Sequence, residues 1–335
     1  MKAQALVCTE QQEFVLDEVE YSPLQPRDLW VRALRTGVSI GTELLLVRSQ
    51  VSWGPFPIIT GYQGVGIVEQ VGSAVKDFAV GDRIYYRGCS AGITWQGRPV
   101  SATSGAHASH VVTDSTNVLH GPAKLPEGVD EEAASLFVMP SVGLNGVNMA
   151  GVAMGDRVVV IGAGLIGLGN VATAKLRGAV TVAVDIDDQR LAVARQLGAD
   201  HTINSSREDL DERMKQIVPD GADVVFEASG NPKCVDLGIA LCRREGKFVF
   251  QGNYGAGPLS FRFLEAHNRR IRAFFPCDDG YVPSRRTVIK LMAEGALDWG
   301  RTITHRLDAR EAPKFYDDVN RGRVKNLLGA VIRWS

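Results

Sequence analysis

A run of apolar residues that passes directly into a glycine-rich turn constrains the fold of this chain more than any other feature. Residues 158–161 are continuously apolar, as in a buried strand, and Gly162, Gly164 and Gly167 follow at G-x-G-x-x-G spacing before a segment compatible with a helix. In a strand–turn–helix unit the first glycine allows the tight turn, the second lets the backbone approach a pyrophosphate, and the third permits close packing of helix on strand. The motif therefore predicts a dinucleotide-binding loop rather than an ordinary turn.

Two further features indicate how a dinucleotide would be held. Leu165 and Ile166 lie between the second and third glycines, where the first amide groups of the helix point at a pyrophosphate. Asp185 ends the next predicted strand, about 20 residues beyond the motif, where a carboxylate accepts hydrogen bonds from the adenosine ribose hydroxyls and repels a 2′-phosphate. The sequence thus predicts NAD rather than NADP as the cofactor.

Apolar strands and helical segments alternate from residue 155 onward, with the clearest helix expected over residues 189–197. Continuous apolar strands are typical of a parallel sheet covered on both faces. The pattern predicts an α/β fold with a doubly wound, six-stranded parallel sheet of the Rossmann type. The six strands are expected over residues 157–161, 181–184, 201–203, 223–227, 247–251 and 270–274.

Residues 1–120 have a different pattern, in which short β-rich runs are separated by Gly, Pro and Asp turns. This pattern predicts a compact, mostly β unit, followed by a helix that begins at Glu131 with Asp130 as its N-cap. Residues 286–294 predict a late helix and residues 330–332 a terminal strand. The sequence does not decide which unit that strand joins.

The composition excludes several classes of protein. The chain has 37 Lys and Arg against 38 Asp and Glu, without a basic block, so we expect no nucleic-acid partner. No apolar run approaches the roughly 20 residues that span a bilayer, and the N-terminus lacks the apolar region of a signal peptide. Five scattered cysteines without C-x-x-C spacing suit a reducing compartment. We therefore expect a cytoplasmic protein with no membrane partner.

Further motifs resemble those of the medium-chain dehydrogenase/reductase superfamily, and in particular its zinc alcohol and polyol dehydrogenases. Besides the G-x-G-x-x-G motif, residues 41–43 resemble the family's G-T-D/E, residues 61–66 its G-H-E-x-x-G, residues 80–83 its V-G-D-R and residues 197–200 its L-G-A-D. The resemblance covers essentially the whole chain. It implies a GroES-like catalytic domain of residues 1–147 with 286–335, an NAD-binding domain of residues 148–285, and a catalytic cleft between them. It also implies a homodimer or homotetramer that acts on a small-molecule substrate.

The departures from the family concern zinc. The family usually holds a catalytic zinc through a Cys before G-T-D, the His and Glu of G-H-E, and a later Cys or Glu. Here the corresponding residues are Ile40 or Ser39, Tyr62, Gln63 and Met139, and none offers the ligands that tetrahedral zinc favours. In the segment 87–104, where the family has four cysteines around a structural zinc, only Cys89 is present. The sequence therefore predicts that both metal sites are absent.

Without a metal, a side chain must take the alcohol proton while hydride moves to the nicotinamide. Tyr62 replaces the His ligand, and Glu43 resembles the acidic residue that orients that ligand, so the two could act as an acid–base pair. The resemblance makes Thr42 a relay hydroxyl, and it places His107 close to the cleft as the next candidate base. The alternatives are that Tyr62 fills the vacated volume with Glu43 satisfying its hydroxyl, and that His107 is structural.

The resemblance also suggests residues around the nicotinamide and the substrate. Asn253 and Tyr254 follow a strand of the cofactor domain, where the family binds the nicotinamide carboxamide; an ordinary turn is the alternative. Trp53, Tyr86 and Trp95 fall in segments that resemble the rim of the substrate cleft, where aromatic faces would suit a sugar ring or a flat macrocycle. Aromatic side chains in the core would give the same pattern.

The function predicted from these observations is a zinc-independent, NAD-dependent alcohol dehydrogenase. It would oxidise a secondary alcohol, with a polyol or sugar-like compound preferred, to a ketone by hydride transfer. The alternatives are an NAD(P)H-dependent quinone or enone reductase, a redox-neutral epimerase that retains its NAD, and a non-catalytic NAD-binding protein.

Overall fold

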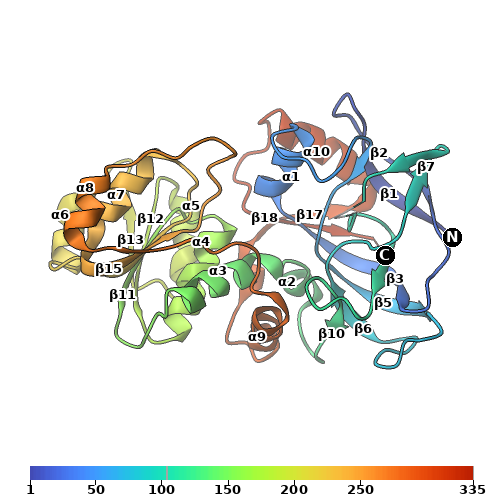
Figure 1. The fold of residues 1–335 in the computed structure, drawn as a ribbon, viewed down its shortest axis with the longest axis horizontal. Coiled ribbons are helices and arrows are strands. Elements are labelled where there is room, and N and C mark those ends of the chain that lie inside the picture. The colour runs from blue at the N-terminus through green and yellow to red at the C-terminus, as the bar shows by residue number, and fades with distance from the viewer. Residues whose placement is uncertain (103–104, 335) are drawn as a thin grey trace. The chain divides into compact units, whose positions relative to one another are not determined.

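The computed structural model describes residues 1–102 and 105–334, and it divides the chain into two compact units. Unit 1 comprises residues 1–137, 292–294 and 303–335, and unit 2 comprises residues 138–291 and 295–302, as the two groups of elements in Figure 1 show. Residues 103–104, at the end of the segment expected to replace the structural zinc lobe, and Ser335 lie outside the described residues.

The division differs from the expected domains of residues 1–147 with 286–335 and residues 148–285. Residues 138–147 belong to unit 2 because helix α3 (Val138–Met149) packs along helix α4 (Leu165–Leu176). The chain also remains in unit 2 beyond residue 285, through most of helix α9 (Tyr281–Ala293). The sequence predicted a helical segment after the glycine motif and a late helix over residues 286–294, but it predicted neither α3 nor what these helices pack against.

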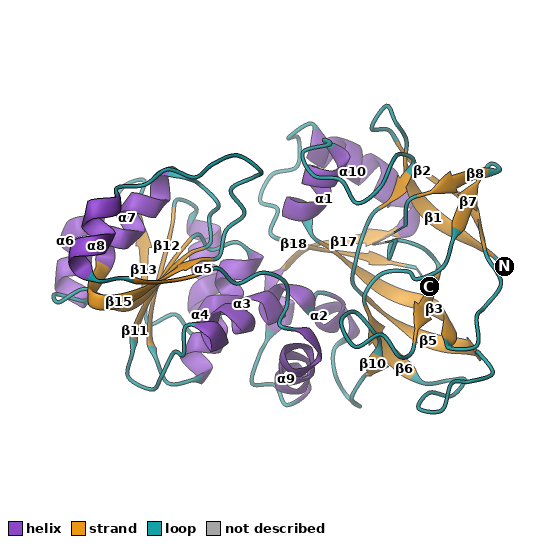
Figure 2. Cartoon of the chain, in the orientation of Figure 1, coloured by secondary structure: helices purple, strands orange, loops and turns teal. Residues whose placement is uncertain are grey.

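Unit 2 contains a six-stranded parallel sheet in the order β13-β12-β11-β14-β15-β16, as predicted. Val159 of the central strand lies beside Val182 on one side and Val225 on the other. These residues join side chains of α6 and α7 in one apolar core, and Figure 2 shows helices beside the strands. The remaining elements of unit 2 are β11 (Arg157–Ile161), β12 (Val180–Asp185), α5 (Asp188–Gln196), β13 (His201–Asn204), α6 (Leu210–Ile217), β14 (Ala222–Glu227), α7 (Lys233–Leu241), β15 (Cys242–Phe250), α8 (Phe263–Arg269), β16 (Arg272–Phe274) and the 3-10 helix η1 (Trp299–Thr302).

Unit 1 contains two mainly antiparallel sheets. One has the order β4-β1-β2-β7-β8, and the other has the order β10-β6-β5-β3-β18-β17 with β9 also paired to β3. The strands are β1 (Lys2–Cys8), β2 (Phe14–Tyr21), β3 (Asp28–Val38), β4 (Ile58–Ile59), β5 (Gly64–Val71), β6 (Arg83–Tyr86), β7 (Ile93–Trp95), β8 (Arg98–Val100), β9 (His110–Asp114), β10 (Ala123–Lys124), β17 (Ile303–Asp308) and β18 (Gly329–Arg333). The helices are α1 (Ile40–Val47), α2 (Glu131–Ser135), α10 (Ala312–Asn320) and the 3-10 helix η2 (Ala309–Glu311).

The terminal strand joins unit 1. Ala330 of β18 lies antiparallel to Val38 of β3, and β17 pairs with the other edge of β18. The pairing brings α10 into unit 1, where it packs on β2. The predicted helix at Glu131 is confirmed, with the Asp130 carboxylate accepting the amide of Glu132. No helix among the described residues is long and apolar enough to cross a membrane.

A hairpin occupies part of the segment where the family has its structural zinc lobe. Strands β7 and β8 are joined through Gln96 and Gly97, which both have positive φ angles. The hairpin extends the first sheet by pairing β7 with β2, and the Trp95 indole Nε1 donates to Asp17 Oδ2 at 2.8 Å. Backbone pairing and this side-chain contact therefore hold the segment against the sheet.

Candidate active site and cofactor-binding loop

The glycines of the G-x-G-x-x-G motif are required by close backbone approaches at the end of β11. Gly162 has a φ of +94°, and a Cβ there would lie 2.6 Å from the Ser229 amide nitrogen. A Cβ on Gly167 would lie 1.8 Å from the Gly162 carbonyl oxygen. A Cβ on Gly164 would meet no atom within 4 Å, so this glycine faces open space. The first and third glycines serve the fold, and the second leaves room beside the loop.

Helix α4 begins in that open space without a side-chain cap. Gly164 is its N-cap residue and has extended backbone geometry, and it has no side chain to accept the first amides of the helix. Leu165 and Ile166 are the first two residues of the helix. Uncapped amides at the positive end of a helix are a ready site for an anion such as a pyrophosphate. The loop thus fits the dinucleotide expected from the sequence.

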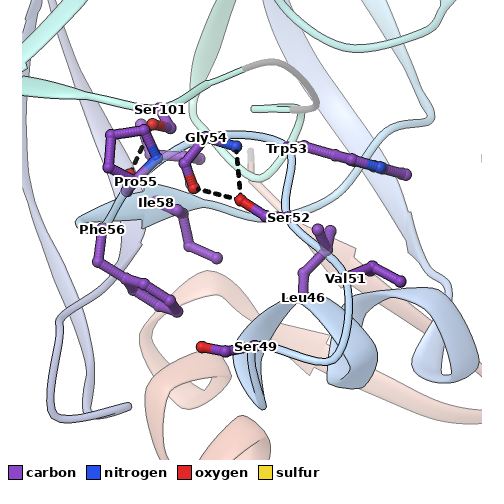
Figure 3. Close-up of a pocket in the computed structure, with 11 residues that line it drawn as sticks. Leu46, Ser49, Val51, Ser52, Trp53, Gly54, Pro55, Phe56, Ile58 and Ser101 are labelled. Atoms are coloured by element: carbon purple, nitrogen blue, oxygen red, sulfur yellow. Dashed lines mark hydrogen bonds between the residues drawn. The ribbon is translucent and has the colours of Figure 1, made fainter. Parts of the chain in front are cut away.

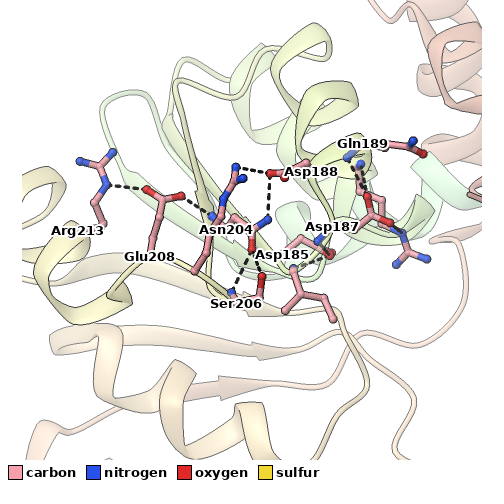
Figure 4. Close-up of polar contacts among 11 residues, drawn as sticks. Asp185, Asp187, Asp188, Gln189, Asn204, Ser206, Glu208 and Arg213 are labelled. Carbon is pink, nitrogen blue, oxygen red and sulfur yellow. Dashed lines mark hydrogen bonds and ion pairs between the residues drawn. The ribbon is translucent and has the colours of Figure 1, made fainter.

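The Asp185 carboxylate lies at the end of β12, and Figure 4 shows it beside Asp187. Its Oδ2 accepts the Ala163 amide of the glycine loop at 2.6 Å, and its Oδ1 accepts the amides of Ile186 at 2.8 Å and Asp187 at 3.0 Å. Ala163 is the second residue of the glycine motif. Asp185 therefore ties the ends of two neighbouring parallel strands together through backbone groups, in addition to any contact with a ribose.

The basic side chains that follow β12 are paired with acidic neighbours. Arg190 lies 3.9 Å from Asp187, and Arg207 lies 2.7 Å from Asp188, whose Oδ1 also accepts the Asn204 amide group. Figure 4 shows these contacts beside Asp185. The charge of each of these two guanidinium groups is thus already balanced within this surface.

Glu227, at the end of β14, is a buried acidic residue that sequence reasoning missed. It accepts the amides of Ser229 at 2.9 Å and Gly230 at 3.2 Å, and the hydroxyls of Ser229 and Tyr254. Burial, followed by the hydrogen bond and charge of Glu227, raises the pKa of Tyr254 well above its usual value. The Tyr254 hydroxyl therefore binds Glu227 in this structure, whereas it was expected to lie at a carboxamide. An acidic residue directly after a buried apolar strand was the available signal.

Asn253 makes the local contact of an ordinary turn, which was the alternative to binding the nicotinamide carboxamide. Its Oδ1 accepts the Gly255 amide at 2.9 Å, which is the side-chain contact of an Asx turn. Asn253 thus shapes the loop after β15.

A second group of functional candidates lies inside unit 1 and centres on Glu43. This residue is in the first turn of α1 and is completely buried. Its Oε1 accepts the Ser39 amide at 2.7 Å, and its Oε2 accepts the Tyr316 hydroxyl at 2.5 Å. His107 Nε2 lies 3.2 Å from the same Oε2 and 2.7 Å from the Tyr316 oxygen. We call Glu43, His107 and Tyr316 the buried triad.

The protons of the buried triad follow from these contacts. Tyr316 has one proton and donates it to Glu43, so the His107 Nε2 that faces the Tyr316 oxygen must carry a proton of its own. His107 Nδ1 lies 2.8 Å from Thr36 Oγ1, which also accepts the Trp334 indole N–H. Every polar atom of the His107 ring therefore has a partner.

The triad keeps Glu43 ionised despite its burial. Burial raises the pKa of the Glu43 carboxyl, but the electrostatic interaction and hydrogen bond with His107, and the hydrogen bonds from Tyr316 and the Ser39 amide, outweigh it. The pKa lies below its usual value. Neither Glu43 nor His107 is exposed, so in this structure neither can touch a substrate directly. The expected role of His107 as a base in contact with substrate is not supported by its surroundings.

Tyr62 is linked to Glu43 through Ser39 and not by direct contact, unlike the expected pair. The Tyr62 hydroxyl donates to Ser39 Oγ and also interacts with the Thr42 hydroxyl. The Arg87 guanidinium carbon lies 5.3 Å from the centre of the Tyr62 ring. Burial raises the pKa of Tyr62, and the hydrogen bonds with Ser39 and Thr42 and the charge of Arg87 oppose that rise. Tyr62 thus lies in a group of hydroxyls beside a cation.

Of the three aromatic residues expected at a substrate rim, one lines a cavity and two belong to or pack on the core of unit 1. Trp53 is 41% exposed, lines a cavity of about 160 Å³ in unit 1, and meets the Tyr62 ring edge-on at 6.0 Å. Figure 3 shows its indole directed away from Phe56 and Ile58 of the same cavity. Tyr86 is completely buried in the core of unit 1, and Trp95 packs on the same core, so Tyr86 is not a rim residue. Strand β6 is buried on both faces at Ile84, Tyr85 and Tyr86, and the sequence did not show that both faces are covered.

Comparison with known proteins agrees with both units. Residues 12–123 match the alcohol dehydrogenase GroES-like domain, and residues 166–294 match the zinc-binding dehydrogenase domain. Sorbitol dehydrogenase 1 of Saccharomyces cerevisiae is 32% identical over 282 residues, which cover 78% of this chain and 78% of that protein. The chain belongs to the zinc-type alcohol dehydrogenase family. The recognised superfamily, the fold class and the oxidoreductase class predicted from the sequence are thereby confirmed.

Two other proteins show how widely this dehydrogenase fold is shared. The D-xylulose reductase of Scheffersomyces stipitis is 29% identical over 336 residues, covering 91% of this chain and 92% of that protein. A putative zinc-binding dehydrogenase from Sinorhizobium meliloti, solved with NADP bound, has a TM-score of 0.86, covers 99% of each chain and is 24% identical. The second likeness concerns the fold alone.

Proposed function

We propose that this dehydrogenase oxidises a secondary alcohol, preferably a polyol or a sugar-like compound, to a ketone with NAD and without zinc. The observation that supports the proposal is the cluster of three hydroxyl groups, from Tyr62, Ser39 and Thr42. By resemblance, the family's catalytic zinc is bound at this position. The names of two relatives, a sorbitol dehydrogenase and a D-xylulose reductase, support the polyol class.

The donor set around Tyr62 does not fit a zinc ion. Tyr62 and Ser39 are hydrogen-bonded to each other, Ile40 packs against an apolar cluster, and Gln63 is a buried neutral amide. Tetrahedral zinc takes thiolate, imidazole or carboxylate ligands, and this set contains none of them. In the part of the chain that the structure describes, no three His, Cys, Asp or Glu side chains are grouped to hold a metal.

The cofactor loop favours NAD. The uncapped amides at the start of α4 would hold the pyrophosphate, and Asp185 would accept the adenosine ribose hydroxyls. A 2′-phosphate would meet the carboxylate of Asp185 and two nearby arginines, Arg190 and Arg207, whose charges Asp187 and Asp188 already balance. Electrostatic repulsion without a compensating cation would disfavour NADP.

Tyr62 is the residue we assign to proton transfer. The bound nicotinamide supplies the hydride acceptor. Once its own proton has left to solvent through the Thr42 hydroxyl, Tyr62 would take the proton of the substrate hydroxyl as a phenolate. Arg87 would favour this phenolate and thereby oppose burial, which raises the pKa of Tyr62 above its usual value. Glu43 and His107 would support this group from behind, because both are completely buried and Glu43 acts on Tyr62 through Ser39 and through its charge.

The cavity beside Trp53 favours a compact substrate. Its volume of about 160 Å³ is well below the range for drug-sized ligands, roughly 300–1,000 Å³, and Trp53 connects it to the Tyr62 ring. A polyol or sugar-like alcohol fits such a space better than a flat macrocycle does.

We also propose that the protein forms a homodimer or homotetramer through the β16 edge of its parallel sheet. Strand β16 ends the sheet, and Phe263, Leu264 and Phe275 near it are exposed. An open strand edge beside apolar side chains is a surface that proteins usually cover. Light scattering of the protein and of Phe275→Asp tests this, because an oligomer formed here should dissociate in the variant.

The first experiment is a substrate panel. Polyols, sugars and simple secondary alcohols are incubated with NAD or NADP, with and without a chelator, while nicotinamide reduction is followed. We expect chelator-resistant reduction of NAD by a polyol. Loss of activity with chelator would contradict the zinc-free reaction, NADH oxidation by quinones would favour a reductase, and cofactor binding without any turnover would favour a non-catalytic protein.

The role of Tyr62 is tested by Tyr62→Phe, with Tyr21→Phe as its control. Tyr21 is also buried and donates its hydroxyl to the His110 carbonyl, so both variants lose one buried phenolic hydroxyl. We expect Tyr62→Phe to lose about 100-fold in kcat, within the usual range for acid–base catalysis, and Tyr21→Phe to keep its turnover. Full turnover in Tyr62→Phe would sink the assignment.

A further inference from the structure

Ser39 is hydrogen-bonded to both Glu43 and Tyr62. Its amide donates to Glu43 Oε1, and its hydroxyl oxygen accepts the Tyr62 proton. Because both contacts belong to one residue at the start of α1, the position of the Glu43 carboxylate sets the position of the hydroxyl that Tyr62 meets. Glu43 thereby acts on Tyr62 without touching it.

The position of Glu43 is in turn fixed from distant parts of the chain. Tyr316 comes from α10 and His107 from the loop before β9, and both meet the Oε2 oxygen. A Cβ on Gly61, whose φ is +81°, would lie 2.5 Å from His107 Cγ, so the ring is also held by the backbone next to Tyr62. Any buried carboxylate requires donors such as Tyr316 and His107. A purely structural cluster would not also require Glu43 Oε1 to hold Ser39, the residue that binds Tyr62.

The triad also influences Tyr62 electrostatically. The charged groups that act on the Tyr62 phenol are Arg87, which lowers its pKa, and Glu43, which raises it; the neutral Ser39 and Thr42 hydroxyls lower it by hydrogen bonding. Donors on Glu43 draw its negative charge toward Tyr316 and His107. Removing such a donor leaves more of that charge to act on Tyr62.

We infer that Tyr316 and His107 are positioning residues for proton transfer, which hold the Glu43 carboxylate so that Ser39 presents its hydroxyl to Tyr62. The inference rests on the proposed function, in which Tyr62 exchanges the substrate proton. The triad is more deeply buried than Tyr62, because Glu43 and His107 are 0% and Tyr316 is 2% exposed, against 7% for Tyr62. Its effect on Tyr62 passes through Ser39 and through the charge of Glu43.

The test is the pH profile of kcat for alcohol oxidation in Tyr316→Phe and Glu43→Gln, which alter the two ends of one hydrogen bond. In the forward reaction Tyr62 must accept a proton, so kcat rises with pH through its pKa. Glu43→Gln removes a negative charge and should move this limb to lower pH, whereas Tyr316→Phe should move it to higher pH, each by roughly half a unit to one unit. KM should change little.

Two replacements of His107 distinguish a role in positioning Glu43 from a role in packing alone. His107→Gln keeps an N–H donor near the Nε2 position and should retain the unaltered profile, whereas His107→Leu should behave like Tyr316→Phe. Tyr21→Phe, the control, should leave the profile in place. Coinciding profiles for all variants, or shifts in the same direction for Glu43→Gln and Tyr316→Phe, would overturn the inference even where the variants are less stable.

A readout without turnover keeps this inference separate from the proposed function. In protein labelled with carbon-13 at the tyrosine ring carbon that bears the hydroxyl, the signal missing from Tyr62→Phe belongs to Tyr62. Its titration should move in opposite directions in Glu43→Gln and Tyr316→Phe. Full turnover in Tyr62→Phe would contradict the proposed function, whereas an unchanged Tyr62 signal in both triad variants would contradict the positioning role.

Discussion

The two candidate site regions are built in opposite ways. The cofactor loop of unit 2 consists mainly of backbone groups from one short stretch, in which Gly162 and Gly167 allow close approach and Gly164 leaves open space. The site of unit 1 consists of side chains from separate segments, with Glu43 on α1, His107 in a loop and Tyr316 on α10. The first depends on the absence of side chains, and the second depends on which side chains meet.

The difference shows where each site is vulnerable. The glycine loop fails when a side chain is added at Gly162 or Gly167, because the backbone contacts there leave no space. A buried polar cluster fails when an atom is removed, because its remaining donors lose their partner in a region without water. The difference is therefore tested by adding a side chain to the glycine loop and by shortening a side chain of the buried triad.

The largest effect is expected for Glu43→Ala. The change leaves the Ser39 amide, the Tyr316 hydroxyl and His107 without their common acceptor, so the free energy of unfolding should fall by about 3–5 kcal/mol. Urea unfolding measures this. Glu69→Ala, which removes a half-exposed carboxylate paired with Arg32 and His110, should cost less than about 1 kcal/mol. Similar losses in the two variants would contradict a special role for burial.

A smaller loss of stability is expected for Gly167→Ala. The added Cβ would lie 1.8 Å from the Gly162 carbonyl oxygen, so the helix must move away from the strand, at a cost of about 1–3 kcal/mol. NADH affinity should fall with it. Gly257→Ala is the control, since a Cβ there meets no atom within 4 Å. Thermal unfolding and NADH titration of both variants decide whether the close approach matters.

A change of cofactor preference is expected for Asp185→Asn. Loss of the negative charge should raise the affinity for NADP relative to NAD by about tenfold, equivalent to about 1.4 kcal/mol. Asp220→Asn, which removes a carboxylate 3.5 Å from Arg157 at the opposite end of β11, should leave the ratio unchanged. Dissociation constants for both cofactors provide the measurement. An unchanged ratio would mean that Asp185 serves only the backbone of the turn.

The smallest effect concerns acid stability. The pKa of Glu43 in the folded protein lies below its usual value, so ionisation of Glu43 stabilises the fold at pH values above the ordinary carboxyl pKa. That stabilisation is lost as pH falls through the lowered pKa of the folded state. The difference in unfolding temperature between the protein and Glu43→Gln should therefore shrink on acidification. A difference that is constant with pH would show that the Glu43 charge does not stabilise the fold.

Sequence reasoning predicted the local elements well and the contacts between distant residues poorly. Strand β11 has the predicted bounds, and the Asp130 cap is where the pattern placed it. Tyr316 was missed because its partner Glu43 lies 273 residues away in the sequence, and Glu227 was missed although it ends a buried apolar strand. Tyr86 was placed at a rim by resemblance, and the structure buries both faces of its strand.

The sequence by itself determined the strand–turn–helix loop and the six parallel strands, because these follow from glycine spacing and apolar periodicity within short stretches. It also indicated the family, through the resemblance of several short motifs. Only the tertiary structure decided that β18 pairs with β3 and that Tyr316 and His107 meet at Glu43. Local patterns are set by steric and solvation preferences of neighbouring residues. A hydrogen bond between Glu43 and Tyr316 depends on how sheets and helices pack, and nothing in the spacing of the two residues encodes it.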